Sequence, residues 1–144
     1  MGHSYHITAH TADVIIRAEG AKLEDLFRSL HRGLYTVIFG KIPRPKASGK
    51  PVEIHLAAPT PEDLVVDFIN ELCFHTLTRR TYLKPPGELE CGFNSLWGVR
   101  AKYDGVNLAG LKFRPAIEVK SATYHKLKVD YKDGKFRTAV VLDI

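Results

Sequence analysis

The chain has 144 residues, of which 44% are hydrophobic and 26% charged, and its formal net charge is +5. These values suit one globular domain spanning residues 1–144 and argue against a disordered chain. No stretch approaches the roughly 20 apolar residues that cross a bilayer, and the N-terminal residues lack the apolar centre of a signal peptide. We therefore expect a cytoplasmic protein without a membrane partner. The two cysteines form no CxxC motif, so neither a disulfide framework nor a thiolate metal site is indicated.

The N-terminal part of the chain combines two strand patterns with one helix pattern. β-branched residues favour strands at residues 4–8 and 12–18. From Leu23 to Ile38 the apolar residues recur at intervals of three and four, which predicts an amphipathic helix that ends at Gly40.

The next part begins with a basic connection and leads into a second helix. Residues 41–50 contain two prolines and four basic residues, which is typical of a loop. Alternating apolar residues at 51–59 then predict a half-buried strand. Thr60, a following proline and two acids form a strong helix start, and we expect this helix to run to about Arg79.

The remainder of the chain is strand-like. A break is expected at Pro85-Pro86-Gly87 and a tight turn at Asp133-Gly134. The strand patterns cover residues 89–93, 96–105, 116–125, 126–132 and 136–144. Two early helices among many strands predict an α+β fold, a two-layer sandwich with a mostly antiparallel mixed sheet and two amphipathic helices on one face.

Two acids near the ends of the chain are candidate metal ligands. His10 and Asp13 lie three apart at a strand entrance, where a turn-capping pair is one interpretation and a ligand pair is another. Strand alternation places Asp143 on the face opposite to Val140, Leu142 and Ile144. Clustered carboxylates need a proton, an arginine or a bound cation, and oxygen ligands suit a hard ion such as Ca²⁺ or Mg²⁺. Pairing of Asp143 with a lysine or arginine remains the alternative.

Two further groups of polar residues have both functional and structural interpretations. Ser121 and His125 fall on one face of the predicted strand, with Lys120 on the other. A hydrolase pair is disfavoured because residues four apart on a strand are too distant for a direct bond, and a structural histidine is the alternative. On the second helix Asn70 shares a face with two acids, which is typical of a solvated surface. Glycine-rich phosphate loops are absent, so no conventionally bound nucleotide is expected.

Four stretches together resemble the archease family over nearly the whole chain. They are HTADV at residues 10–14, VVDFINEL at 65–72, EVKSATYHKLKV at 118–129 and VVLDI at 140–144. Their order and spacing carry the resemblance. It implies a protein that is not itself an enzyme and that activates a GTP-dependent RNA ligase of tRNA splicing. That ligase joins RNA 3′-phosphate or cyclic phosphate ends to 5′-hydroxyls, and the activator promotes its guanylylation and multiple turnover.

The resemblance also implies a metal site. Its ligands map onto Asp13, Asp143 and Ile144, and the expected ion is Ca²⁺ or another hard divalent cation. His10, Lys120 and His125 are candidates for functional support of this site, and none is assigned as catalytic.

Two positions depart from the family pattern or match it loosely. Family members commonly have Glu where this chain has Ala9, so an additional carboxylate is missing and metal affinity is expected to be weaker. Phe136 stands where an aromatic residue, often Trp, precedes the last strand.

Two other functions compete with ligase activation. A basic module that binds tRNA directly is supported by the net charge and by residues 41–50, although the strands lack the aromatic platform of single-stranded RNA readers. A small metal-dependent phosphoesterase using His10, Asp13 and His125 is the third hypothesis, and it would turn over phosphoesters alone.

Overall fold

The computed structural model describes residues 2–9, 13–46 and 48–144, without the side chains of residues 9 and 86. In chain order its elements are β1 (His3–Ala9), β2 (Asp13–Gly20), α1 (Leu23–Phe39), β3 (Lys50–Ala58), α2 (Pro61–Cys73), the π-helical turn η1 (Phe74–Thr78), β4 (Thr81–Asn94), β5 (Leu96–Asn107), the 3₁₀ turn η2 (Leu108–Gly110), β6 (Ser121–Ala122), β7 (Asp130–Lys132) and β8 (Lys135–Asp143).

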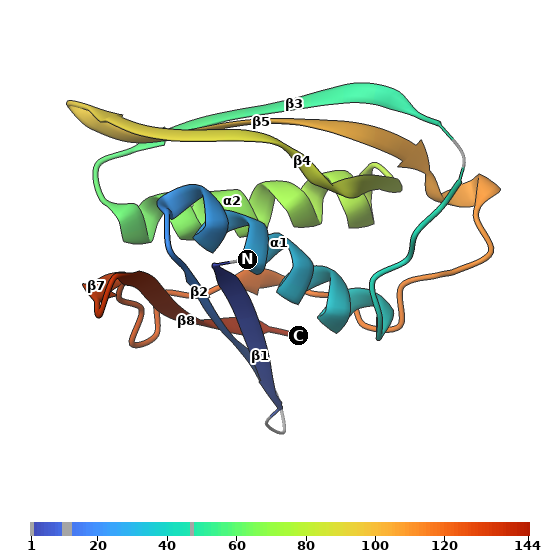
Figure 1. The fold of residues 1–144 in the computed structure, drawn as a ribbon. Helices are drawn as coiled ribbons and strands as arrows, with labels where there is room; N and C mark the ends of the chain where they lie inside the picture. The colour runs from blue at the N-terminus through green and yellow to red at the C-terminus, as the bar shows by residue number, and fades with distance from the viewer. Residues whose placement is uncertain (1, 10–12, 47) are drawn as a thin grey trace.

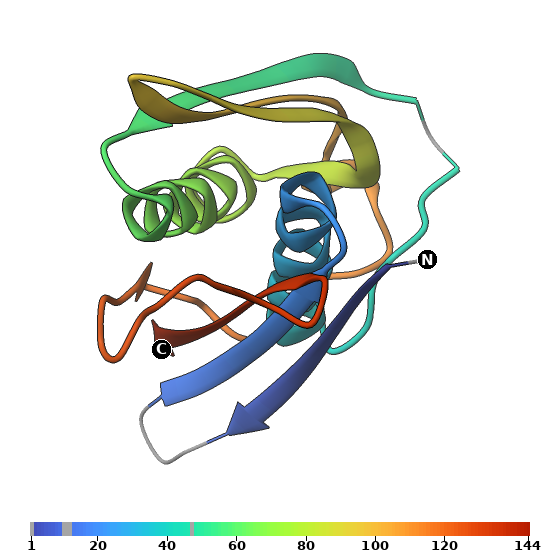
Figure 2. The same ribbon diagram turned by 60° about the vertical axis from the view of Figure 1, so that its left-hand side comes forward.

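The strands form two sheets, and the two helices lie between them (Figures 1 and 2). The five-stranded sheet has the order β1-β2-β8-β6, with β7 also paired to β8, and the three-stranded sheet has the order β3-β5-β4. All strand pairs among the described residues are antiparallel. The predicted α+β class is confirmed. The arrangement is sheet, helices, sheet, where a single sheet with helices on one face was expected.

Helix α1 explains why two sheets are needed, because it contacts both of them. On one side a Cβ at Gly33 would lie only 2.7 Å from Cγ2 of Ile16, so the helix backbone packs closely on β2. On the other side the ring of Tyr35 lies 4.8 Å from that of Tyr82 in β4. A helix buried on both sides requires a second apolar layer, and β3, β4 and β5 supply it.

The ends of both helices follow from local sequence. Helix α1 stops at Gly40, whose left-handed φ of 80° allows its N–H to donate to the carbonyl of Thr36. Helix α2 starts at Thr60, whose hydroxyl accepts from the N–H of Asp63 at 3.0 Å. With η1 included, the second helical segment ends one residue before Arg79, as predicted.

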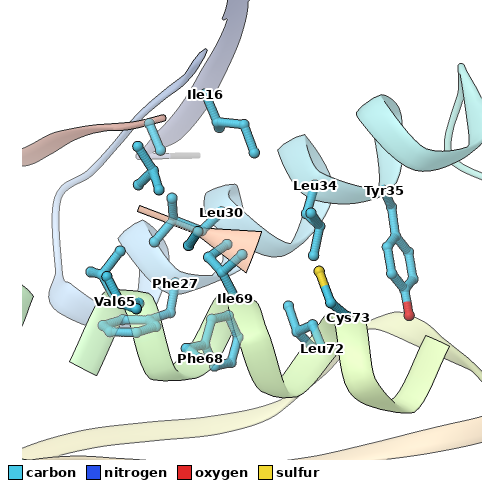
Figure 3. Close-up of a cluster of buried hydrophobic side chains, with 14 of the residues drawn as sticks. Ile16, Phe27, Leu30, Leu34, Tyr35, Val65, Phe68, Ile69, Leu72 and Cys73 are labelled. Atoms are coloured by element: carbon cyan, nitrogen blue, oxygen red, sulfur yellow. The ribbon is translucent and has the colours of Figure 1, made fainter. Parts of the chain in front are cut away.

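The core fills the space between the helices and the sheets. In Figure 3 the side chains of α1, such as Phe27 and Leu30, meet those of α2, such as Phe68 and Ile69, and Ile16 approaches from β2. The rings of Phe27 and Phe68 pack edge to face at 5.0 Å. In the described ranges neither helix is long and apolar enough to cross a membrane.

The segment before β8 contains much less strand than predicted. Residues 116–125 were expected to form one strand and 126–132 another, but only Ser121–Ala122 and Asp130–Lys132 do so. The reason is that several N–H groups find partners outside a ladder. Those of residues 116 and 117 donate to the carbonyl of Ile38, and that of Val129 donates to Glu62 of α2. The segment is therefore held by the helices.

The break expected at residues 85–87 interrupts the pairing of β4 with β5 but does not end the strand. Strand β4 continues through Pro85-Pro86-Gly87, and its register with β5 shifts between Lys84 and Glu88. Strand β4 lies at the edge of its sheet, where proline is tolerated because no second neighbour requires its N–H.

Candidate functional site

Asp13 and Asp143 lie directly opposite each other on adjacent strands. Asp13 is the first residue of β2, Asp143 is the last of β8, and the antiparallel register pairs them. Figure 2 shows the end of β8 beside the start of β2. Their neighbours Val14 and Leu142 are buried against the helices, so alternation directs both acids to the outer face of the sheet. Side chains in such a pair have Cβ atoms about 5 Å apart.

Among the described residues, few groups compensate the charge of the two carboxylates. Asp13 is half-buried, and its Oδ1 is fully buried without a hydrogen-bond partner in residues 2–9, 13–46 and 48–144. Asp143 is exposed. In the part of the chain that the structure describes, neither acid takes part in an ion pair with a lysine or arginine. Like charges placed opposite each other in a sheet are destabilising, so this pair lowers the stability of the metal-free protein.

Strand β6 brings Lys120 and Ser121 to the same place. The N–H of Lys120 donates to the carbonyl of Asp143 at 2.8 Å, and Ser121 is the cross-strand neighbour of Asp143. The side chain of Lys120 is exposed, and Ile144 packs at the margin of the core. The backbone of Lys120 therefore lies beside that of Asp143, and its supporting role stays a prediction.

Helix α2 holds this segment in position. The amide oxygen of Asn70 accepts from the N–H of Ala122 at 2.9 Å, and Asp63 accepts from the hydroxyl of Tyr124 at 2.7 Å. That bond, with one from Thr60, lowers the pKa of the Asp63 carboxyl. The prediction of a solvated surface is thus wrong for Asn70. The sequence does not reveal this contact of Asn70, because its partner Ala122 lies 52 residues away.

The histidines do not complete the predicted constellation. His125 is exposed in a turn, and its backbone N–H donates a hydrogen bond to the hydroxyl of Thr123 at 3.4 Å. It does not share a strand face with Ser121, because the strand ends at Ala122. His10 lies outside the described residues.

The oxygen atoms at the acidic pair are ligands of the kind that a hard cation prefers. The two carboxylates offer four oxygens, the buried Oδ1 of Asp13 has no hydrogen-bond partner within the described part of the chain, and an oxygen of Ile144 follows directly in the chain. Ca²⁺ accepts six to eight oxygen ligands, so water or backbone carbonyls would complete its shell. Among the described residues no group of three or more histidine, cysteine or acidic side chains could hold a metal. A metal here would therefore depend on these two acids and on backbone or solvent oxygens.

The described residues thus form a small α+β protein with two acidic side chains paired on the outer face of one sheet. The model of the Archease protein family (MTH1598/TM1083) matches residues 5–144. Protein archease of Pyrococcus abyssi is 31% identical over 140 residues, covering 94% of each chain. That of Methanosarcina mazei is 27% identical over 145 residues, covering 99% of this chain and 97% of the relative. The chain therefore belongs to the archease family.

Solved structures show the same fold. The solution structure of protein 1598 of Methanobacterium thermoautotrophicum superposes with a TM-score of 0.73 at 19% identity, covering 97% of this chain and 98% of that one. The crystal structure of an archease from Thermotoga maritima, described as a possible chaperone, gives 0.64 at 19% identity, covering 95% and 94%.

Proposed function

We propose that the protein is a non-enzymatic activator of the GTP-dependent ligase that joins RNA 3′-phosphate or cyclic phosphate ends to 5′-hydroxyls in tRNA splicing. Membership of the archease family supports the proposal. The observation that carries it is the cross-strand pair of Asp13 and Asp143, with a buried carboxylate oxygen that has no hydrogen-bond partner among the residues the structure describes.

In this proposal Asp13 and Asp143 bind Ca²⁺ or another hard divalent cation, with an oxygen of Ile144 as a further ligand. A bound cation supplies stabilisation of the negative charge that grows during nucleotidyl transfer. Because β2 and β8 are interior to the sheet, their backbones keep the two carboxylates at a fixed spacing. Lys120, whose backbone N–H donates to the carbonyl of Asp143, is exposed and offers a positive charge to an acidic group of the ligase or its nucleotide.

An alternative within the same function is that the protein resets the ligase conformation after each turnover. In that case the acidic pair would contribute to docking, and the step that accelerates would be product release. Single-turnover guanylylation separates the two, because only a direct contribution to guanylylation raises its rate.

The proposal is tested by multiple-turnover joining of a 3′-phosphate RNA with limiting ligase and GTP. We expect the wild-type protein to accelerate turnover, Asp13→Ala and Asp143→Ala to abolish the acceleration, and Glu53→Ala to retain it. Glu53 is a suitable control because it is an exposed acid in β3, which belongs to the other sheet, where it lies opposite Lys102. No acceleration by the wild type would refute ligase activation. Full activity of both site variants would refute the role of the acidic pair.

A further inference from the structure

The outer face of the five-stranded sheet carries a pocket of about 450 Å³ beyond the acidic pair. Strands β1, β2 and β8 form its floor, and residues 126–130 form one wall. Arg17 projects from the floor and follows Asp13 by four positions in β2, on the same face. The pocket and the acidic pair therefore lie about 13 Å apart on one continuous surface.

Arg17 has no carboxylate opposite it. Its neighbours across the strands are His6 in β1 and Ala139 in β8. Its Nη1 donates to the hydroxyl of Thr8 at 2.7 Å, which orients the guanidinium without neutralising it. Within the described residues, neither Arg17 nor Lys126 of the pocket wall is in an ion pair.

The two acids of the pocket are already engaged with other cations. Glu19 contacts Lys135 at 3.3 Å and Arg137 at 3.2 Å, and Asp130 contacts Lys128 at 3.4 Å. Hydrogen bonds from Ser4 and Lys135 to Glu19 lower the pKa of its carboxyl, so it stays ionised and keeps these partners. The charges of Arg17 and Lys126 are therefore left in excess.

The outer face of the three-stranded sheet shows the opposite arrangement. There Lys102 lies between Glu53 and Glu88, and Arg100 lies opposite Glu90. Each of these cations has an acid across the strand, whereas Arg17 has none. The excess of positive charge at the pocket is thus a property of this face and does not simply follow from the net charge of the chain.

We propose that this pocket binds a phosphate group of an RNA strand. A guanidinium pairs with two phosphate oxygens at once, and a lysine adds a point charge that neutralises the group. Arg17 supplies the guanidinium and Lys126 the point charge, with the ring of His6 as a further hydrogen-bonding group at the rim. That this RNA is the ligase substrate rests on the proposed function, but phosphate binding by the protein alone does not.

The test is fluorescence anisotropy of a labelled 3′-phosphate RNA oligonucleotide with the protein alone. Arg17→Ala is compared with Arg100→Ala, because both remove one exposed arginine from the outer face of a sheet and lower the net charge of +5 equally. We expect Arg17→Ala to weaken binding about tenfold and to reduce the slope of log K against log salt by about 0.7, one phosphate contact on a single strand. Arg100→Ala should change the affinity for RNA less than about twofold, because Arg100 is far from the pocket and its charge is screened by salt.

Equal weakening by both variants, or no weakening by Arg17→Ala, would overturn the proposal. Arg17→Lys keeps the positive charge and loses only the bidentate contact with phosphate. It should therefore retain the salt dependence of binding and part of the affinity. Because Arg17 is exposed, an unchanged thermal midpoint is expected for each variant.

Competition identifies the source of the phosphate group. We expect unlabelled RNA to displace the probe at far lower concentration than GTP or inorganic phosphate, because the phosphates that flank the bound one also lie in the positive field of Arg17 and Lys126. Displacement by GTP at lower concentration than by RNA would overturn the assignment to RNA. If RNA binding depends on Arg17 but the ligase is not activated, the proposal of ligase activation is refuted and the phosphate site is supported. If the ligase is activated but the protein alone does not bind RNA, the phosphate site is refuted and ligase activation is supported.

Discussion

Replacing Asp143 by asparagine should stabilise the metal-free protein and remove its response to Ca²⁺. Asp143 and Asp13 are cross-strand neighbours, and in the described residues no lysine or arginine pairs with either. Asparagine has nearly the same shape, removes one of the two charges, and has an amide that can donate to the Asp13 carboxylate. The substitution therefore separates the electrostatic cost of the pair from its ability to bind a cation.

The magnitude follows from the usual Cβ spacing of a cross-strand pair, taken as the separation of the two charges. At about 5 Å the charges repel by about 0.8 kcal/mol in water and by about 3 kcal/mol at an effective dielectric constant of about 20. Asp143 is exposed, so the lower part of this range applies, and we expect a gain of about 1 kcal/mol. In a domain of this size that raises the melting temperature by about 2–4 °C. Ca²⁺ at 100 times its dissociation constant should stabilise the wild type by about 2.7 kcal/mol.

The assay is thermal unfolding with EDTA and with increasing Ca²⁺. Wild type should show a rise of roughly 5–10 °C at saturating Ca²⁺, and Asp143→Asn should start higher and show little or no rise. Asp130→Asn should behave as wild type, because its partner Lys128 is exposed and such pairs contribute little. If Asp143→Asn melts lower than wild type in EDTA, or keeps the full Ca²⁺ response, the electrostatic argument is wrong.

Two further predictions concern stability. Complete burial lowers the pKa of His31 to about 3 from 6.5, so below about pH 6.5 the unfolded chain binds one more proton and stability falls by about 1.4 kcal/mol per pH unit until about pH 3. Urea unfolding at about pH 7 and about pH 5 should show a smaller loss in His31→Gln than in wild type, and an equal loss would contradict this cause. Thr60→Ala removes the hydroxyl that accepts from the N–H of Asp63, which should cost about 1 kcal/mol and lower the urea midpoint with an unchanged slope. An unchanged midpoint would show that the cap does not contribute.

The helices could be predicted because their signals are local. The spacing of apolar residues from Leu23 to Ile38, the left-handed residue Gly40 and the capping residue Thr60 act within one or two helical turns. The α+β class followed from the same signals. The second sheet did not, because amphipathic periodicity identifies one buried stripe, whereas the packing of Gly33 against β2 shows burial on another side as well.

The strand predictions failed where distant side chains compete for the backbone. The segment 116–132 has strand-like residues, yet Asn70 and Glu62 of α2 accept hydrogen bonds that a ladder partner would otherwise accept. Such bonds join residues 52 and 67 positions apart, and no local pattern reports them. The edge position of β4 likewise decides that prolines can lie within it.

For the candidate site, the sequence by itself determined which groups are available: Asp13 and Asp143 at strand ends, and an alternation that places Asp143 on the face opposite to Leu142. Only the tertiary structure decided that the two acids are direct neighbours, that Lys120 and Ser121 join them, and that Arg17 lacks a carboxylate across its strand. The physical reason is range. Periodicity and capping act over a few residues, whereas the register between β2 and β8 depends on packing of the whole core.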